Sequence, residues 1–227
     1  MPEATLGNFI QNLVIVPLTL LPIINPLSGA PVFMLTVGND HSVACRLARQ
    51  VAINCWFVIV GALLVGTYVL ALFGISLPIV RIAGGLLVAA SGWKLLQSGD
   101  DNDEVKTALV RDHPDELSER DIAKRAFFPI TFPLTTGPGT IAASIALGAS
   151  FPRQPALYVI NAFVAIAGAT ITVAVVYLVY RNAPRLLTKL GEVGTLVMMR
   201  LLAFVLVCIG FQIVWIGWAE LNGLPTH

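Results

Sequence analysis

Two segments concentrate proline, glycine and small hydroxyl side chains inside stretches that are otherwise apolar. They read PLTLLPIINPLSGAP, ending at Pro31, and FFPITFPLTTGPGTI, ending at Ile141. Proline removes a backbone donor and clashes with the preceding turn, and glycine relaxes the chain, so helices through these segments are expected to break. Backbone groups released by a break cannot face lipid, because nothing there hydrogen-bonds them. Both segments are therefore predicted to be buried in protein or to line a polar cavity.

The chemistry that these predicted breaks could offer is the binding of a small polar solute. Half-helices beginning near Ser28 and Thr140 would present free N–H groups and a partial positive charge, which suit a carboxylate or another electronegative group. The candidate substrate-binding residues are Asn25, Pro26, Ser28, Gly29, Thr135, Thr136, Gly137, Pro138, Gly139 and Thr140. The alternative is that the breaks are structural kinks whose hydroxyls bond the preceding turn of helix.

Four further polar residues lie inside apolar stretches and are candidates for a supporting role. Asn54 and Asn161 could bond the broken segments or a substrate, or join neighbouring helices. Arg81 and Arg200 could extend to the membrane interface or point inward, toward the carbonyl ends of broken helices. Asp and Glu are absent from the interior of the apolar stretches and occur only at the edges of the last stretch. All histidines lie outside the apolar stretches. The sequence therefore predicts no metal site, no cofactor and no catalytic constellation, and the chain is not expected to be an enzyme.

The elements that must position these residues are membrane helices. The 227 residues are 56% hydrophobic and 12% charged, and a bilayer core about 30 Å thick needs roughly 20 apolar residues per helix. Six apolar stretches reach this length, at 9–38, 51–73, 75–97, 126–150, 155–180 and 196–221. A net charge of +1 without a basic run argues against nucleic acid as a partner. The predicted fold is an all-α membrane protein of six transmembrane helices, with the first and fourth spans broken.

The two halves of the chain share an order of polar and helix-breaking residues. One constant offset relates Pro17, Thr19, Pro26 and Ser28 to Pro129, Thr131, Pro138 and Thr140. Three spans per half is an odd number, so consecutive copies would enter the membrane from opposite sides, an arrangement typical of transporters. We predict two inverted three-helix repeats, at 1–99 and 126–227, joined by a charged cytoplasmic loop at 100–125.

The distribution of Lys and Arg predicts the orientation, because these residues in short loops resist translocation. Eleven of them fall on one side of the predicted spans, whereas the other side holds only Arg153. We therefore expect a multi-pass protein of the bacterial inner membrane with both termini on the periplasmic side.

Four longer motifs carry a resemblance to a known family: INPLSGAPVF, FGISLPIVRIAGGLLVA, FPITFPLTTGPGTIA and RLLAFVLVCIGFQIVWIG. On these motifs the chain resembles the MarC family of bacterial inner-membrane proteins over nearly its whole length. The resemblance implies six helices with an inverted repeat and a distant kinship with LysE-type exporters of small molecules. Some relatives look like transporters of small neutral amino acids such as alanine and glycine.

These observations favour a secondary transporter or exporter of a small polar metabolite, with neutral amino acids as the favoured class. Two alternatives stay open, a passive pore and a non-transporting membrane scaffold that acts through the 100–125 loop. The expected partners are membrane lipid and a small-molecule substrate, with a homo-oligomer among the options.

Overall fold

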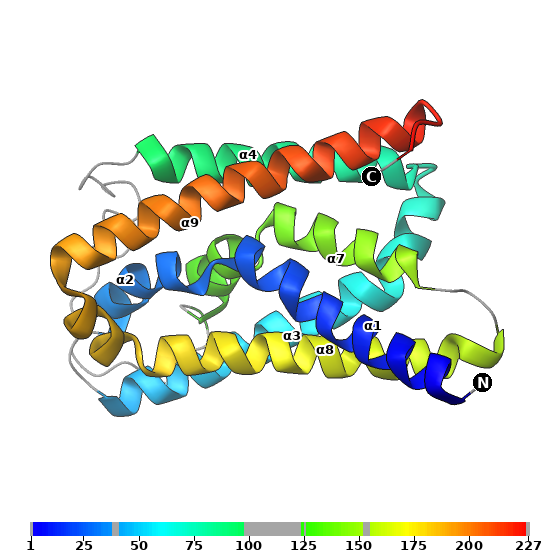
Figure 1. Ribbon diagram of the computed structural model, residues 1–227. Helices are drawn as coiled ribbons and strands as arrows, with labels where there is room; N and C mark the ends of the chain where they lie inside the picture. The colour runs from blue at the N-terminus through cyan, green and yellow to red at the C-terminus, as the bar shows by residue number, and fades with distance from the viewer. Residues whose placement is uncertain (1, 38–40, 98–123, 125, 152–154, 226–227) are drawn as a thin grey trace.

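The computed structural model describes residues 2–37, 41–97, 124, 126–151 and 155–225. Every element in these ranges is helical, as the all-α prediction requires (Figure 1). In chain order the helices are α1 (Pro2–Ile24), α2 (Pro26–Val37), α3 (His41–Leu72), α4 (Leu77–Gln97), the π-helix η1 (Ala126–Thr135), α7 (Pro138–Ser150), α8 (Pro155–Arg181) and α9 (Ala183–Leu221). The predicted loop at 100–125 lies almost wholly outside the described residues, as does Arg153.

Four of these helices are each long and apolar enough to cross a bilayer, namely α3, α4, α8 and α9. Two bent pairs meet the same criterion when each is taken as one span: α1 with α2, bent by 54°, and η1 with α7, bent by 65°. The described chain thus holds four membrane-crossing helices, or six if each bent pair is one span. The bends fall in the first and fourth predicted spans, where breaks were expected.

The first break occupies a single residue. Asn25 has a φ of +45°, in the left-handed region that asparagine tolerates better than most residues. The following Pro26 disfavours a right-handed helical conformation at Asn25, and its own fixed φ suits the first position of a new helix. For this reason α2 begins at Pro26, two residues before the predicted start near Ser28.

The second break is spread over the whole of η1. Phe128 and Phe132 have extended backbone inside the helix, and each precedes a cis proline, a position that favours extended conformations. Gly137 is also extended, and α7 then begins at Pro138, the first helical position that proline prefers. The predicted start near Thr140 is therefore accurate to two residues.

Two helices extend well beyond the predicted apolar stretches. Helix α3 begins at His41 rather than at residue 51, because the basic and polar residues before that point lower hydropathy without ending the helix. Helix α9 begins at Ala183 rather than at residue 196, with an interruption at Gly191, where φ is +66°. Glycine adopts this conformation at no steric cost. Hydropathy therefore located the apolar part of each helix and missed its more polar N-terminal part.

The helices form three layers (Figure 1). Helices α4 and α9 pair along their length in one outer layer, and α3 and α8 lie side by side in the other. The two broken spans fill the middle layer, where α1 packs on α7 and α8, and η1 packs on α2 and α3. The segments predicted to bind a solute are therefore the core of the bundle.

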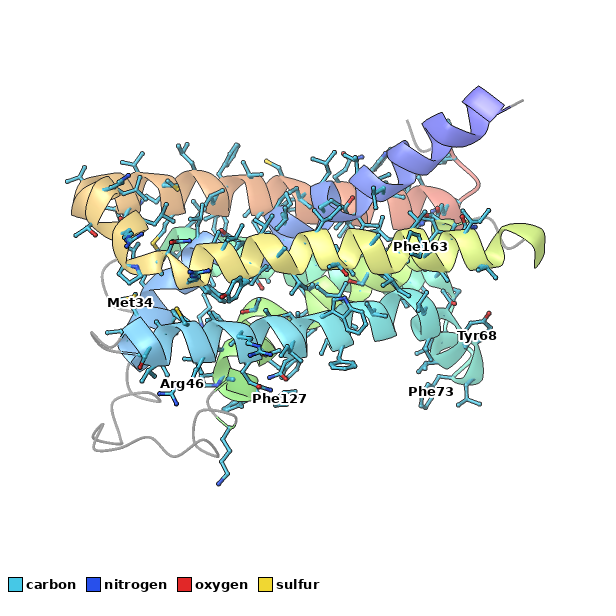
Figure 2. All side chains as sticks on the ribbon, turned by 90° about the horizontal axis from the view of Figure 1, so that it is seen from below. Met34, Arg46, Tyr68, Phe73, Phe127 and Phe163 are labelled. Carbon is cyan, nitrogen blue, oxygen red and sulfur yellow. The ribbon has the colours of Figure 1, made fainter. Side chains whose placement is uncertain are left out.

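The outer surface of the bundle is apolar. Figure 2 shows the side chains of Phe73 and Phe127 pointing away from the helices. The side chains of Phe73, Phe127 and Phe163 are 71%, 53% and 63% exposed. Large apolar side chains that are this exposed suit a protein surrounded by lipid.

The pairing of α4 with α9 depends on small residues at the contact. A Cβ added to Gly210 of α9 would lie 2.4 Å from the backbone nitrogen of Ala89 of α4. Membrane helices have no hydrophobic drive to associate within lipid, so close backbone approach at small residues is a main source of their packing energy.

Candidate functional site

Tyr180, in the last turn of α8, lies between the two broken spans. Its ring stacks on Phe33 of α2, with centroids 4.9 Å apart and planes 5° from parallel. Its hydroxyl lies 2.8 Å from Oγ1 of Thr135 in η1. A Cβ added to Gly29 of α2 would lie only 2.5 Å from the same oxygen. Gly29 and Thr135, predicted as site residues from separate halves of the chain, therefore flank one buried side chain.

The hydrogen bonds fix the direction of this contact. The Thr135 hydroxyl donates to the backbone oxygen of Ile130 at 2.7 Å. A threonine hydroxyl has one hydrogen, so the Tyr180 hydroxyl must be the donor to Thr135. The phenol is thus held by a hydrogen bond to one broken span and by ring stacking on the other.

The other hydroxyl groups near the breaks, those of the candidates Ser28, Thr136 and Thr140 and of the neighbouring Thr131, bond to nearby backbone. Those of Thr131, Thr136 and Thr140 donate to the carbonyl five residues earlier, at 2.7, 2.9 and 3.5 Å. Ser28 donates to the backbone oxygen of Asn25 at 2.9 Å. These residues follow the structural alternative raised from the sequence, in which hydroxyls bond the preceding turn. The oxygen atoms of these hydroxyl groups can still accept a hydrogen bond, but their hydrogen atoms are already donated to backbone carbonyls.

Asn25 differs from these residues. Its side chain is buried, with the residue only 5% exposed, and neither its Oδ1 nor its Nδ2 has a hydrogen-bond partner in the described part of the chain. A carboxamide offers two donor hydrogens and an acceptor oxygen. Asn25 therefore keeps its full capacity to bind a polar group at the point where the first span bends.

The remaining candidates around the second break shape the path of the chain. A Cβ on Gly137 would lie 2.7 Å from the backbone oxygen of Pro133, and one on Gly139 would lie 2.5 Å from Cγ2 of Val88. Glycine at these positions permits the sharp turn and the packing of α7 on α4. Pro138 is exposed and Pro26 is buried, each at the start of a helix.

The supporting candidates have unlike surroundings. Asn54 accepts a hydrogen bond from Gln50 within α3, at 3.3 Å, and Asn161 is half-buried on α8. Arg81 of α4 is half-buried and forms an ion pair with Glu220 of α9. Arg200 is exposed on α9. The two arginines therefore have different surroundings.

Two site residues were missed from the sequence, Tyr180 and Cys55. The Cys55 side chain of α3 is fully buried and lies next to Thr131 of η1. A thiol in an apolar helix is typical of packing, and a tyrosine in the last turn of a span is typical of the membrane interface. The sequence positions of Cys55 and Tyr180 therefore did not indicate that these residues lie at the helix breaks.

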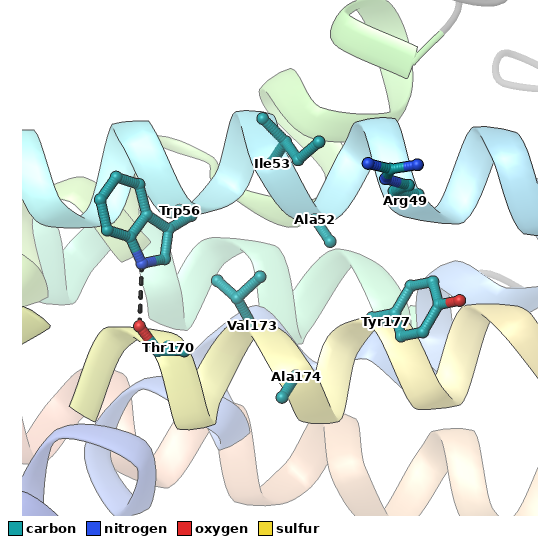
Figure 3. A pocket seen from close by; sticks show the side chains of 8 residues that line it. All are labelled: Arg49, Ala52, Ile53, Trp56, Thr170, Val173, Ala174 and Tyr177. Carbon is teal, nitrogen blue, oxygen red and sulfur yellow. Dashed lines mark hydrogen bonds between the residues drawn. The ribbon is translucent and has the colours of Figure 1, made fainter. Parts of the chain in front are cut away.

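A cavity of about 470 Å³ lies away from the breaks, between α3 and α8 (Figure 3). Its lining residues are Arg49, Ala52, Ile53, Trp56, Thr170, Val173, Ala174 and Tyr177. None of the predicted site residues is among them. Within the described ranges, no three His, Cys, Asp or Glu side chains are grouped so that they could hold a metal ion.

Comparison with known proteins gives a consistent picture. A family profile described as "MarC family integral membrane protein" matches residues 10–221. The proteins named UPF0056 inner membrane protein MarC from Escherichia coli strain K12 and from Shigella flexneri are each 32% identical over 209 residues, which is 89% of this chain and 91% of theirs. No solved structure matches the chain. With the apolar helices, these relatives support a multi-pass location in the inner membrane, and the orientation of the termini stays a prediction. The chain belongs to the MarC family of integral membrane proteins.

Proposed function

We propose that this protein is a secondary transporter or exporter of a small polar metabolite, with neutral amino acids as its substrate class and with both termini outside the cytoplasm. The substrate binds where the two broken spans meet. The observation that carries the proposal is the unbonded carboxamide of Asn25, inside the core and at a bend. Leaving a buried polar group unsatisfied costs about 1–3 kcal/mol. Polar groups kept at such a cost within a membrane are by default candidates for function.

The contacts between elements support an inverted repeat. In such a repeat α1 corresponds to η1, α2 to α7, α3 to α8, and α4 to α9. The contact between α1 and α7 then corresponds to the contact between η1 and α2. The contact between α1 and α8 likewise corresponds to the contact between η1 and α3. Transporters built this way bind their substrate near the middle of the membrane, at discontinuous helices between the repeats.

The residues around the breaks favour a small zwitterion. The candidate substrate-binding residues carry no charged side chain, and an ion with net charge would be costly to hold there without a partner. A zwitterionic amino acid could place its carboxylate at a helix N-terminus and bond its ammonium group to the Asn25 oxygen. The close approach of Gly29 to Tyr180 leaves little room, which favours substrates as small as glycine and alanine.

Counterflow of radiolabelled alanine and glycine in proteoliposomes tests the proposal, with Asn25→Gly as the variant. Glycine accepts the left-handed backbone of Asn25 without strain, so the bend is retained while the carboxamide is lost. We expect the natural chain to show saturable counterflow and Asn25→Gly to lose it. Ser28→Ala is the matched control, because the Ser28 hydroxyl bonds only the backbone nearby, and it should transport normally.

The same assay separates this proposal from its rivals. Flux that does not saturate and shows no counterflow would indicate a passive pore. An Asn25→Gly variant that unfolds at the same temperature as the natural chain and transports equally well would contradict the proposed site. If neither these amino acids nor a broad panel of metabolites moves, the transport function itself is wrong.

A further inference from the structure

The cavity between α3 and α8 is a groove with two distinct ends. The helices run antiparallel, and the indole N–H of Trp56 donates to Oγ1 of Thr170 across the gap, at 3.0 Å, at one end. Figure 3 shows Arg49 and Tyr177 at the other end. Between them the groove is lined by alanine, isoleucine and valine side chains.

The groove opens on the lipid-facing surface of the bundle. Both of its helices are long and apolar enough to cross a bilayer. Ile53 is 40% exposed, and Ala174 and Thr170 are also exposed, so the groove is open along its length. An apolar channel of this kind suits an acyl chain better than a polar metabolite.

Positive charge gathers at one end of the groove. Arg49 is exposed and makes no ion pair with any residue that the structure describes. The guanidinium of Arg181 lies 5.9 Å from the ring centre of Tyr177, over its face. Arg49 and Tyr177 line this end of the groove, and Arg181, which is not part of the lining, lies beside it over the Tyr177 ring. Guanidinium groups bind phosphate through paired hydrogen bonds, and basic pockets between membrane helices bind anionic lipid headgroups.

We propose that this groove is a binding site for an anionic phospholipid. The phosphate binds Arg49 and Arg181, and one acyl chain lies along Ala52, Val173 and Ala174 as far as Trp56. The charge at one end and the apolar lining beyond it match the two parts of such a lipid. This site is separate from the helix breaks and does not depend on the proposed transport function.

Quenching of Trp56 fluorescence by brominated lipid tests the proposal, because bromine on an acyl chain quenches only an indole that it contacts. The chain also contains Trp93, Trp215 and Trp218, which are replaced by phenylalanine. The protein is placed in phosphatidylcholine vesicles that contain a minor fraction of brominated phosphatidylglycerol or, in parallel, brominated phosphatidylcholine. We expect quenching to favour the anionic lipid, with Arg49→Gln weakening that preference about fivefold, the effect of one arginine near a membrane surface.

Arg46→Gln is the matched control. Arg46 is an exposed arginine one turn earlier on α3 that does not line the groove (Figure 2). It should leave the preference unchanged. Equal losses for both variants would mean that surface charge alone attracts the lipid, and no preference in the natural groove would also overturn the proposal.

A second variant keeps the charge and fills the groove. Ala174→Leu places a larger side chain on the exposed lining, so we expect less quenching by both lipids, with thermal unfolding confirming that the protein remains folded. Quenching that persists in Ala174→Leu would show that the acyl chain does not lie in the groove. If Arg49→Gln fails to fold, the quenching of Ala174→Leu still tests whether an acyl chain lies in the groove.

Discussion

The contact of Gly29 with Tyr180 gives the sharpest test of how the two broken spans are held together. In Gly29→Ala the added Cβ would lie 2.5 Å from the phenol oxygen and 3.4 Å from the ring carbon that carries it. Uncharged atoms pack at roughly 3.5 Å, so the hydroxyl must move by about 1 Å. The stacking on Phe33 and the hydrogen bond to Thr135 both oppose this movement.

Overpacking of this kind costs about 1–3 kcal/mol. For a chain of this size, a loss of about 2 kcal/mol corresponds to a fall in Tm of roughly 4–8 °C. Tyr180→Phe removes the oxygen and leaves only the contact at 3.4 Å, which is ordinary packing. That variant alone should cost about 0.5–1.5 kcal/mol, because one hydrogen bond is lost. In the Tyr180→Phe background, Gly29→Ala should then cost close to nothing.

Thermal unfolding of the four proteins in detergent measures this double-mutant cycle. Gly61→Ala is the control, because an added Cβ there meets no atom within 4 Å. It should leave the Tm unchanged or raise it slightly. A Gly29→Ala variant as stable as the natural chain, or one that costs the same with Phe as with Tyr at position 180, would refute this account of the contact.

Two further predictions concern the pairing of α4 with α9. Gly210→Ala should lower the Tm by more than Gly29→Ala does, because its Cβ would meet the backbone nitrogen of Ala89, which cannot rotate away; equal stability with Gly61→Ala would contradict the close packing. Arg81→Glu should lower the Tm by placing two like charges together, an effect of about 1 kcal/mol or more for a partly buried pair. Adding Glu220→Arg should restore most of the loss, and a double variant no more stable than Arg81→Glu would mean that the ion pair contributes nothing.

The amino-acid sequence by itself determined the helical class, the membrane-crossing stretches and the two places where they bend. Hydropathy and helix breaking depend on a residue and its immediate neighbours, so both can be read along the chain. Asn25 was identified for the same reason, since it directly precedes a proline within an apolar span. The local rules were less accurate for helix ends, because α3 and α9 begin well before their apolar stretches, in residues that lower hydropathy.

The tertiary structure alone decided which candidates have free polar groups and which residues join the breaks. Ser28 and Thr135 looked equivalent to Asn25 in the sequence, yet their hydroxyls donate to nearby backbone and the Asn25 carboxamide does not. Tyr180 reaches both broken spans, and the groove beside Trp56 needs residues more than a hundred positions away. Such contacts depend on how each helix is rotated and placed against its neighbours, and no property of a single segment specifies that geometry.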